Sequence, residues 1–256
     1  MQPADELRDA LETYLRALVF AGELGGLEEA LRYSLESGGK RVRPVLCLAV
    51  AEANGASVEE ALPAAAALEL VHTFSLVHDD LPAMDDDDER RGRPSAHVAF
   101  GEGVALLAGD ALLAEAVRLG LSYESGHVAR DLAHATLGMI GGQYRDITGD
   151  DGDLEELHRL KTGRLFVAAV RLGLDVAGIG DDARDEWIAF GEDVGLLFQV
   201  VDDLLDGDGY AERLGAEEAR RLAEEVSARA HGRLDEVGAD TQVLRDLVEA
   251  LTFRTG

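Results

Sequence analysis

Apolar residues recur at helical spacing along most of the chain. In residues 4–20 they follow the i, i+3, i+4, i+7 spacing that gives a helix one buried face. These positions are Leu7, Leu11, Tyr14, Leu15 and Leu18. Residues 104–122, 165–178 and 185–206 are apolar almost all round, which is typical of the central helices of a bundle. The pattern therefore predicts several helices, the inner ones heavily buried.

A long helix is also expected to begin at residue 57 and to end near Pro82. Ser57 and Glu60 have the spacing of a capping box at its start. Strand signals are missing, because β-branched residues do not alternate and no Asn-Gly turn occurs. No linker rich in Pro, Gly or Ser and no fixed repeat divides the chain. We expect an all-α fold, a multi-helix bundle, in one domain over residues 1–256.

The chain carries a net charge of −27 at pH 7. Nucleic acids and anionic membrane surfaces are polyanions, so this charge argues against both as partners. Such acidity is typical of adaptation to high salt, where screening is strong and net charge keeps a protein soluble. An anionic substrate would need local positive charge to overcome the repulsive field.

Three further features bear on the expected location. The acidic N-terminus lacks a basic stretch followed by an apolar run, so no secretory signal is predicted. No uncharged apolar segment reaches the roughly 18 residues that cross a bilayer, so no membrane span is expected. The single cysteine, Cys47, excludes an intrachain disulfide and fits a reducing cytosol. A cytoplasmic protein is expected.

One aspartate cluster lies in the predicted helix 185–206. Asp202 and Asp206 are four residues apart and share a helix face, with Asp203 next to them. Like charges at this spacing destabilise a bare helix, but a divalent cation between them reverses the effect. Mg²⁺ fits, because it takes one or two carboxylates and completes its coordination with water and phosphate oxygens. The alternative is an acidic helix end in solvent.

A second aspartate cluster follows the predicted helix that ends near Pro82. Asp79 and Asp80 precede the proline and Asp85 follows it. A spacing of six does not lie on one helical face, so the backbone must bend at Pro82 to bring Asp85 beside Asp79. The alternative is a solvated acidic loop, and this alternative is strongest for the aspartates that follow Asp85.

The two lysines of the chain lie close to glycines. Of 24 basic residues only Lys40, in "SGGKRVRP", and Lys161, in "RLKTGR", are lysine. Two carboxylate sets on buried helices, with these lysines and several arginines available, describe a cavity for a polyphosphate. Its walls would be Ala, Leu, Val and Phe. A phosphate site that opens into an apolar tube indicates an amphiphilic substrate such as a prenyl diphosphate.

Six motifs resemble one family in the same order along the chain. They are "GGKRVRP" (38–44), "LVHTFSLVHDDLPAMDDDDERRGRP" (70–94), "AGDALL" (108–113), "GGQYRD" (141–146), "KTG" (161–163) and "FQVVDDLLD" (198–206). The chain resembles the trans-prenyltransferases, or polyprenyl synthetases, and most closely the bacterial-type short-chain farnesyl diphosphate synthases. The resemblance covers most of the chain and implies a helical bundle of the isoprenoid synthase type with a central cavity.

The resemblance implies a reaction that depends on Mg²⁺. An allylic diphosphate ionises, the double bond of isopentenyl diphosphate attacks the carbocation, and a proton is lost. The implied metal ligands are Asp79, Asp80, Asp85, Asp202, Asp203 and Asp206. The implied catalytic residues are Asp79, Asp80, Asp85, Asp202, Asp203 and Lys161.

The resemblance also implies two diphosphate sites. Lys40, Arg43, His72 and Arg91 would bind isopentenyl diphosphate. Arg90, Lys161, Thr162 and Gln199 would bind the allylic diphosphate. From the residues alone, His72 is equally a satisfied core histidine, and Gln143 and Asp146 are equally helix packing.

Product length is expected to depend on Phe74 and Ser75. Phe74 lies five residues before Asp79, about one and a half turns down the same helix, so its ring can form the floor of the apolar tube. An aromatic residue there, with two extra residues inside the first aspartate motif, resembles enzymes that stop at fifteen carbons. A C20 product is the alternative, and Phe74 as ordinary core is another.

The chain departs from the family after Asp206. The region looks shortened, and no lysine follows Lys161, where relatives supply another to the diphosphate site. This motivates a second hypothesis, a catalytically weak subunit that binds diphosphate and modulates a partner synthase. A class I terpene cyclase is a third, which the "DDLLD" and "GGKRVRP" motifs oppose. A homodimer is implied by the resemblance alone.

Overall fold

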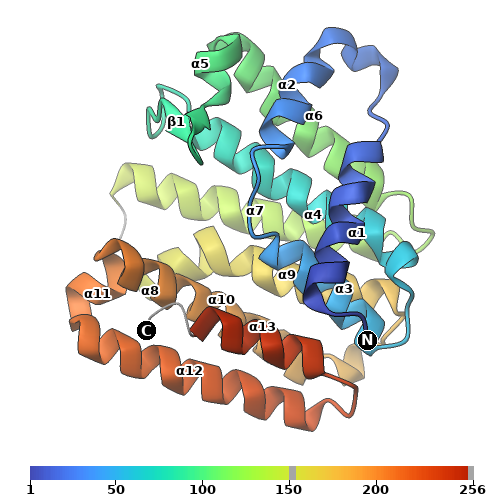
Figure 1. Ribbon diagram of the computed structural model, residues 1–256, viewed down its shortest axis with the longest axis vertical. Helices are drawn as coiled ribbons and strands as arrows, with labels where there is room; N and C mark the ends of the chain where they lie inside the picture. The colour runs from blue at the N-terminus through green and yellow to red at the C-terminus, as the bar shows by residue number, and fades with distance from the viewer. Residues whose placement is uncertain (150–153, 253–256) are drawn as a thin grey trace.

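The structure is a computed structural model that describes residues 1–149 and 154–252, and most of these are helical (Figure 1). The first elements are α1 (Ala4–Ala17), η1 (Gly22–Leu27), α2 (Glu28–Leu35), α3 (Val42–Ala53), α4 (Val58–Asp79), β1 (Glu89–Arg90), β2 (Arg93–Pro94), α5 (Ala96–Phe100) and α6 (Glu102–Gly120). The later ones are α7 (His127–Thr148), α8 (Leu154–His158), η2 (Arg159–Gly163), α9 (Arg164–Val176), η3 (Asp181–Ala183), α10 (Asp185–Asp206), α11 (Gly209–Leu214), α12 (Ala216–Glu236) and α13 (Gln242–Thr252). The predicted all-α fold is confirmed.

Helix α4 is a core helix that packs along α6 and against α3 and α9. The predicted capping box is present, since the Ser57 side chain accepts from the Glu60 amide and the Glu60 carboxylate accepts from the Ser57 amide. By length and composition α4 is the one described helix that could cross a membrane. However, 67% of that stretch is buried inside the protein, as expected of a core helix.

A tyrosine hydroxyl is inserted into the first turns of α4, next to Pro63. Tyr123 accepts from the Ala64 amide (3.0 Å) and donates to the Glu60 carbonyl (2.7 Å). In a regular helix these two backbone groups bond to each other. The hydroxyl thus satisfies both groups where the helix contains a proline.

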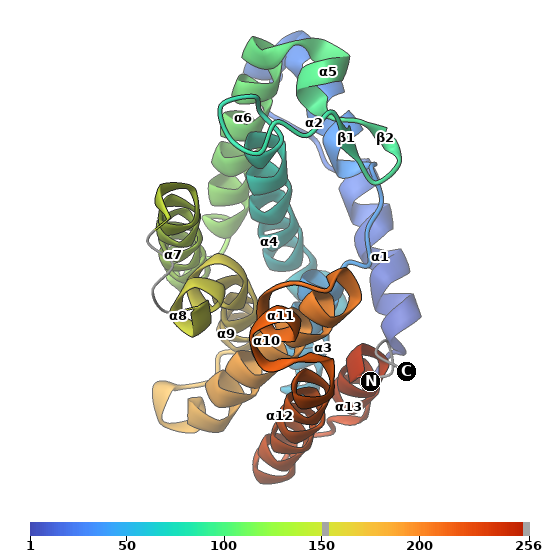
Figure 2. The ribbon, with the colours of Figure 1, turned by 90° about the vertical axis from the view of Figure 1, so that its left-hand side faces the viewer.

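The helices after α8 form the other half of the molecule. Helices α9, α10 and α12 lie together in Figure 2, away from α5, and α10 packs against both α9 and α12. Helix α10 spans Asp185–Asp206, the bounds expected from its apolar run. Buried apolar side chains from α1, α3, α4, α6, α9, α10, α12 and α13 form a single cluster.

A two-stranded hairpin corrects the expectation that no strand occurs. β1 and β2 pair in an antiparallel register, with Glu89 opposite Pro94 and Arg90 opposite Arg93. The two turn residues, Arg91 and Gly92, both have positive φ (55° and 76°), as a type I′ turn requires. Arginine rarely takes this conformation, so the turn carried no recognisable sequence signal.

Candidate active site

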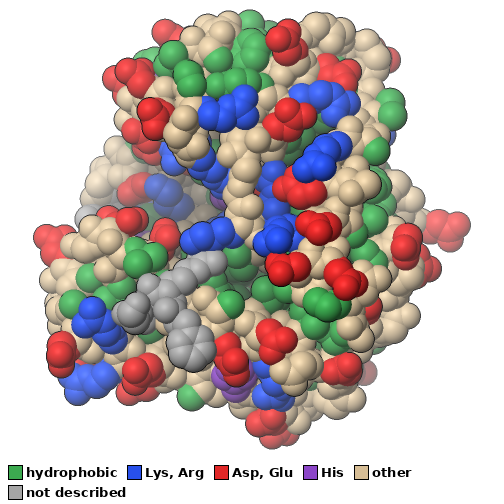
Figure 3. Space-filling view, viewed as in Figure 1, with side chains coloured by type: hydrophobic (Ala, Val, Ile, Leu, Met, Phe, Trp, Pro, Cys, Tyr) green, Lys and Arg blue, Asp and Glu red, His purple; other side chains and the backbone are tan. Residues whose placement is uncertain are grey.

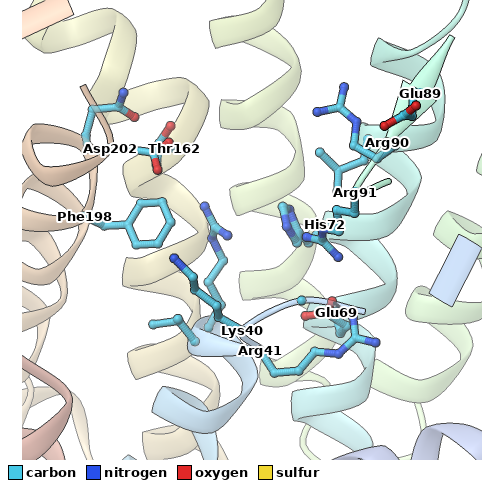
Figure 4. A pocket seen from close by; sticks show the side chains of 15 residues that line it. Lys40, Arg41, Glu69, His72, Glu89, Arg90, Arg91, Thr162, Phe198 and Asp202 are labelled. Carbon is cyan, nitrogen blue, oxygen red and sulfur yellow. Dashed lines mark hydrogen bonds and ion pairs between the residues drawn. The ribbon is translucent and has the colours of Figure 1, made fainter. Parts of the chain in front are cut away.

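The bundle encloses a polar cavity of about 710 Å³ between α3, α4, α10 and the β1–β2 hairpin. Its polar lining residues are Lys40, Arg41, Arg43, Glu69, His72, Glu89, Arg90, Arg91, Thr162, Gln199 and Asp202. Figure 4 shows Lys40, Thr162, Phe198 and Asp202 on one side, and His72, Arg90 and Arg91 on the other. Every residue expected to bind substrate except Lys161 therefore lines this one cavity.

The surface around the cavity differs in charge from the rest of the visible face. Lysine and arginine side chains gather around the hollowed middle of the face in Figure 3, while acidic side chains are spread across it. The cations are thus concentrated where the chain is concave. This provides the local positive charge that an anionic substrate needs in a chain of net charge −27.

A buried ion network lies beneath the cations. The guanidinium of Arg41 donates to Glu12 on α1 (2.8 Å), to Glu69 on α4 and to the Leu35 carbonyl (2.6 Å). The side chains of Arg41 and Glu69 are only 2% and 3% exposed. Arg41 has a left-handed backbone (φ 49°) just before α3, a strained conformation that these contacts hold. The network fixes the loop between Lys40 and Arg43, and sequence reasoning had missed it.

Gly39 allows the hairpin to reach this loop. A Cβ at Gly39 would lie 2.6 Å from a guanidinium nitrogen of Arg91. With no side chain there, Arg91 lies over the loop and donates to the Gly38 carbonyl. The "GGK" sequence thus brings Arg91 beside Lys40, from a position fifty residues further along the chain.

Arg43 lies at the junction of two cavities. Its guanidinium packs over the rings of Phe166 (4.5 Å) and Phe198 (5.2 Å), and its Nε is buried without a hydrogen-bond partner among residues 1–149 and 154–252. Burial lowers the pKa of Arg43 to about 10, so it remains charged at neutral pH. A buried charge with an unused donor is suited to bind an incoming anion.

His72 lies one turn of α4 beyond Glu69. Burial lowers its pKa well below the ordinary value of 6.5, and the neighbouring arginines, first among them Arg43 and Arg91, lower it further. The imidazole is therefore neutral at pH 7 while the cavity is empty. A neutral ring can still donate one hydrogen bond to an anion.

An apolar cavity of about 580 Å³ adjoins the polar one, and Arg43, His72, Leu76 and Thr162 line both. Its further lining residues are Phe74, Ser75, His78, Asp79, Met84, Asp110, Leu113, Met139, Ile140, Gln143, Tyr144, Ile147, Lys161 and Leu165. Phe74 and Ser75 thus both line an apolar wall, as expected. The α7 residues of this wall were not predicted, because their position depends on how α7 packs.

Asp79 ends α4 at the rim of the apolar cavity. The chain turns back at Pro82, and the Asp85 amide donates to the Asp79 carbonyl (2.9 Å). The expected bend is therefore present. Burial raises the pKa of Asp79 to about 6; Lys161 opposes this shift and Asp85 adds to it. Two carboxylates thus crowd together at the rim.

Asp80 and Asp203 lie differently from their neighbours. Asp80 is buried and accepts from Arg90 (Nε, 2.8 Å), so it orients an arginine of the polar cavity. Asp203 is also buried, and it accepts from the Gln199 amide (2.6 Å) and the Tyr210 backbone amide (2.8 Å). Both carboxylates, expected as metal ligands, have protein partners. Like Asp85 and Asp206, they line neither large cavity.

The remaining acidic residues suit a metal shared with the substrate. Asp202 lines the polar cavity, and its pKa is raised by burial and by the Asp206 and Asp203 carboxylates. Within residues 1–149 and 154–252, no three acidic, histidine or cysteine side chains already surround a metal position. Mg²⁺ fits such a set, because it needs only one or two carboxylates and takes its other oxygens from water and phosphate. The carboxylates that would hold Mg²⁺ are those of Asp79 and Asp85 on one side of the site and those of Asp202 and Asp206 on the other.

Lys161 and Thr162 lie in a π-helical turn, η2. Such turns are rare and frequently occur at functional sites. The turn packs tightly against α7, since a Cβ at Gly142 would lie 2.5 Å from the Lys161 amide nitrogen. The Lys161 side chain pairs with Asp146 on α7, which gives Asp146 a defined role in the site. Arg213, the first basic residue after Asp206 in the chain, lines neither cavity.

Comparison with known proteins identifies the family. Residues 25–225 match the model of the polyprenyl synthetase family. The chain is 42% identical over 226 residues to a geranylgeranyl diphosphate synthase from Cyanophora paradoxa, covering 82% of this chain and 75% of that protein. It is 40% identical over 204 residues to a farnesyl diphosphate synthase from Bacillus subtilis (strain 168), covering 74% and 69%. A solved geranyltransferase from Legionella pneumophila has a TM-score of 0.89 at 31% identity, covering 98% and 96%.

An all-α bundle that places cations and carboxylates at the mouth of an apolar cavity defines a class of prenyl-transferring enzymes. The chain belongs to the polyprenyl synthetase family. The resemblance seen in the sequence and the expectation of a prenyltransferase are both confirmed.

The buried Arg41–Glu69 pair yields a stability prediction. Arg41→Met leaves the Glu69 carboxylate buried without its partner, so we expect it to lower the free energy of unfolding by about 3–5 kcal/mol. Arg41→Met combined with Glu69→Met should recover only part of this loss, because Arg43 and Arg91 also lose the Glu69 carboxylate. Arg221→Met, which removes an exposed pair with Glu218, is the control and should cost at most about 1 kcal/mol. Equal losses for the buried and the exposed pair, measured by denaturant unfolding in molar salt, would contradict the assignment.

His72 yields a prediction on pH. Because its folded pKa lies below the unfolded value of 6.5, protonation favours the unfolded chain. The stability from neutral His72 is fully present above pH 6.5 and is lost as the pH falls toward the folded pKa, by up to about 1.4 kcal/mol per pH unit. His72→Gln should therefore reduce the fall in unfolding free energy between pH 7 and pH 5. The same change at the exposed His134 should not, and identical curves for both variants would count against a buried neutral His72.

Proposed function

We propose that residues 1–256 form one domain that condenses isopentenyl diphosphate with an allylic diphosphate. The product is a short-chain prenyl diphosphate, farnesyl (C15) first and geranylgeranyl (C20) as the alternative. The observation that carries this proposal is that the two cavities adjoin, with Arg43, His72, Leu76 and Thr162 lining both. It gives room for charged head groups next to an apolar chain. Relatives named as farnesyl and geranylgeranyl diphosphate synthases support it.

The polar cavity serves isopentenyl diphosphate. Lys40, Arg43 and Arg91 converge on its diphosphate, and neutral His72 donates one hydrogen bond. Arginine forks suit phosphate oxygens because two parallel N–H groups bind at once. Since Arg41 and Asp80 hold the backbone loop and Arg90 from behind, the cations are oriented before substrate arrives.

The allylic diphosphate lies between Asp79 and Asp202, with its tail in the apolar cavity. Asp79, Asp85, Asp202 and Asp206 would hold Mg²⁺, which would supply positive charge to the diphosphate. Lys161 and Arg90 add to that charge as the C1–O bond breaks and its electron pair leaves with pyrophosphate. The double bond of isopentenyl diphosphate then attacks C1, and a proton is lost. The apolar walls keep water from the cation.

A homodimer and a cytoplasmic location are part of the proposal. Large apolar side chains on α6 and α7 are exposed, among them Leu107 (55%) and Leu137 (68%), and they support a second copy as the partner. Buried Cys47 and the acidic composition support a reducing, salt-rich cytosol. A mass of one 27.3-kDa chain by sedimentation in molar salt would rule out the dimer.

Product analysis tests the reaction. The protein is incubated with isopentenyl diphosphate, Mg²⁺ and each allylic starter, at low and at molar salt, and the products are separated by chain length. We expect a C15 product that chelation of the metal abolishes. Asp79→Asn should lower kcat by about 100-fold or more, because charge stabilisation at the leaving group is lost.

Asp88→Asn is the matched control. Asp88 belongs to the same acidic run, but its side chain is 89% exposed and lines neither large cavity. Its substitution should leave kcat unchanged. If no starter gives a product while the diphosphate still binds with Mg²⁺, the synthase assignment fails and the modulating-subunit hypothesis takes its place.

The apolar cavity yields a prediction on chain length. Phe74→Ala removes a ring from the cavity wall, so we expect products at least one five-carbon unit longer. The control is Val77→Ala, on the same helix but outside this cavity. Chromatography of the products distinguishes the two. An unchanged product length in Phe74→Ala would make the ring ordinary core.

A further inference from the structure

Gln143 on α7 is a polar residue in an apolar wall. It lines the apolar cavity one turn from Met139 and one turn from Ile147. Both of its side-chain polar atoms, Oε1 and Nε2, are buried and have no hydrogen-bond partner in the part of the chain that the structure describes. By contrast Gln199, the other glutamine of the site, donates to Asp203 (2.6 Å).

Helix packing does not account for this side chain. A buried donor or acceptor without a partner costs about 1–3 kcal/mol, and an apolar side chain of the same shape avoids that cost. Buried polar groups of proteins nearly always have partners, so an exception in a cavity indicates a partner that arrives with a ligand. The amide of Gln143 is therefore a binding group that the protein alone leaves unused.

The position of Gln143 places it at the reactive end of the cavity. Its neighbour Gly142 touches the backbone of Lys161, in the turn that carries Thr162. Asp79 lines the same cavity. Gln143 thus lies near the groups that receive the leaving diphosphate.

The chemistry of that end selects a role for the amide. When the C1–O bond breaks, positive charge spreads over C1 and C3 of the allylic group. An amide oxygen carries partial negative charge, and between apolar walls its dipole is screened less than in water. A carboxylate in its place would repel the diphosphate and trap the cation as an ester, and a neutral amide does neither.

We propose that Gln143 is a catalytic residue whose carbonyl oxygen faces the allylic cation and stabilises it. This rests on the proposed function, since it names a further group for the same reaction. The amide contributes more to the ionised state than to the bound substrate. Its loss therefore affects kcat more than the KM for the allylic diphosphate.

Two binding probes separate this role from packing. One is a protonated tertiary amine that mimics the allylic cation, added with inorganic pyrophosphate and Mg²⁺. The other is an allylic thiolodiphosphate, which is uncharged at the carbon and ionises poorly. Calorimetry should show that Gln143→Leu weakens the amine about tenfold or more and the thiolodiphosphate less than threefold. In turnover, kcat should fall about 10- to 100-fold, within the range for losing one charge-stabilising group.

Controls make the outcomes decisive. Leu132→Met, on α7 but outside both cavities, should change neither probe, and Gln143→Met provides a second apolar variant with a flexible chain. Both Gln143 variants should unfold at no lower denaturant concentration than the wild type, because they remove an unpaired buried amide. Equal weakening of both probes, or no weakening of the amine, overturns the role of Gln143. If the wild type binds no thiolodiphosphate at all, the proposed function itself fails.

Discussion

The site depends on a single buried carboxylate among several arginines. Glu69 is the buried acid beneath the polar cavity, and it attracts Arg41, Arg43 and Arg91. Without it, three guanidinium groups would converge in a poorly hydrated space with only Glu12 beside Arg41 and Asp202 near Arg43, and an unpaired buried charge costs several kcal/mol. Glu69 neutralises part of that charge, and the positive charge that remains is available to bind an anionic substrate. The balance is the central physical constraint of the fold, since α1, α3, α4 and the hairpin all meet there.

The same constraint accounts for the strained backbone. Within the described residues only three non-glycine positions have positive φ, Arg41, Asp86 and Arg91. All three lie in loops that present charged groups to the site or its rim. Such conformations cost of order 1–3 kcal/mol each and persist where surrounding contacts fix them. For Arg41 and Arg91 the fixing contacts are the ion network and the Gly38 carbonyl. The contacts that hold the strained backbone of these residues are thus the same contacts that hold their charged side chains.

Much of the fold followed from local pattern, because helices are governed by nearby residues. The 3.6-residue spacing of apolar residues predicted both ends of α10, and Pro82 predicted the bend that brings Asp85 back to Asp79. Partners from distant segments escaped this reasoning. Asp80 accepts from an arginine ten residues later, in a hairpin whose Arg-Gly turn lacks the usual sequence signal. Helical geometry could have separated Asp203 from its neighbours, because Asp203 cannot lie on the helix face that Asp202 and Asp206 share.

The concentration of cations around one hollow also affects how substrates reach it. A diphosphate that approaches the protein meets a net charge of −27, while on the face in Figure 3 the basic side chains that attract it gather around the hollow. Salt shortens the range of that field from about 10 Å at 0.1 M to about 3 Å at 1 M, while buried contacts are screened much less. Added salt therefore reduces the long-range repulsion of the diphosphate more than it weakens the contacts that bind it inside the cavity. For this chain ionic strength assists encounter, the reverse of its effect on enzymes whose surface field attracts their substrate.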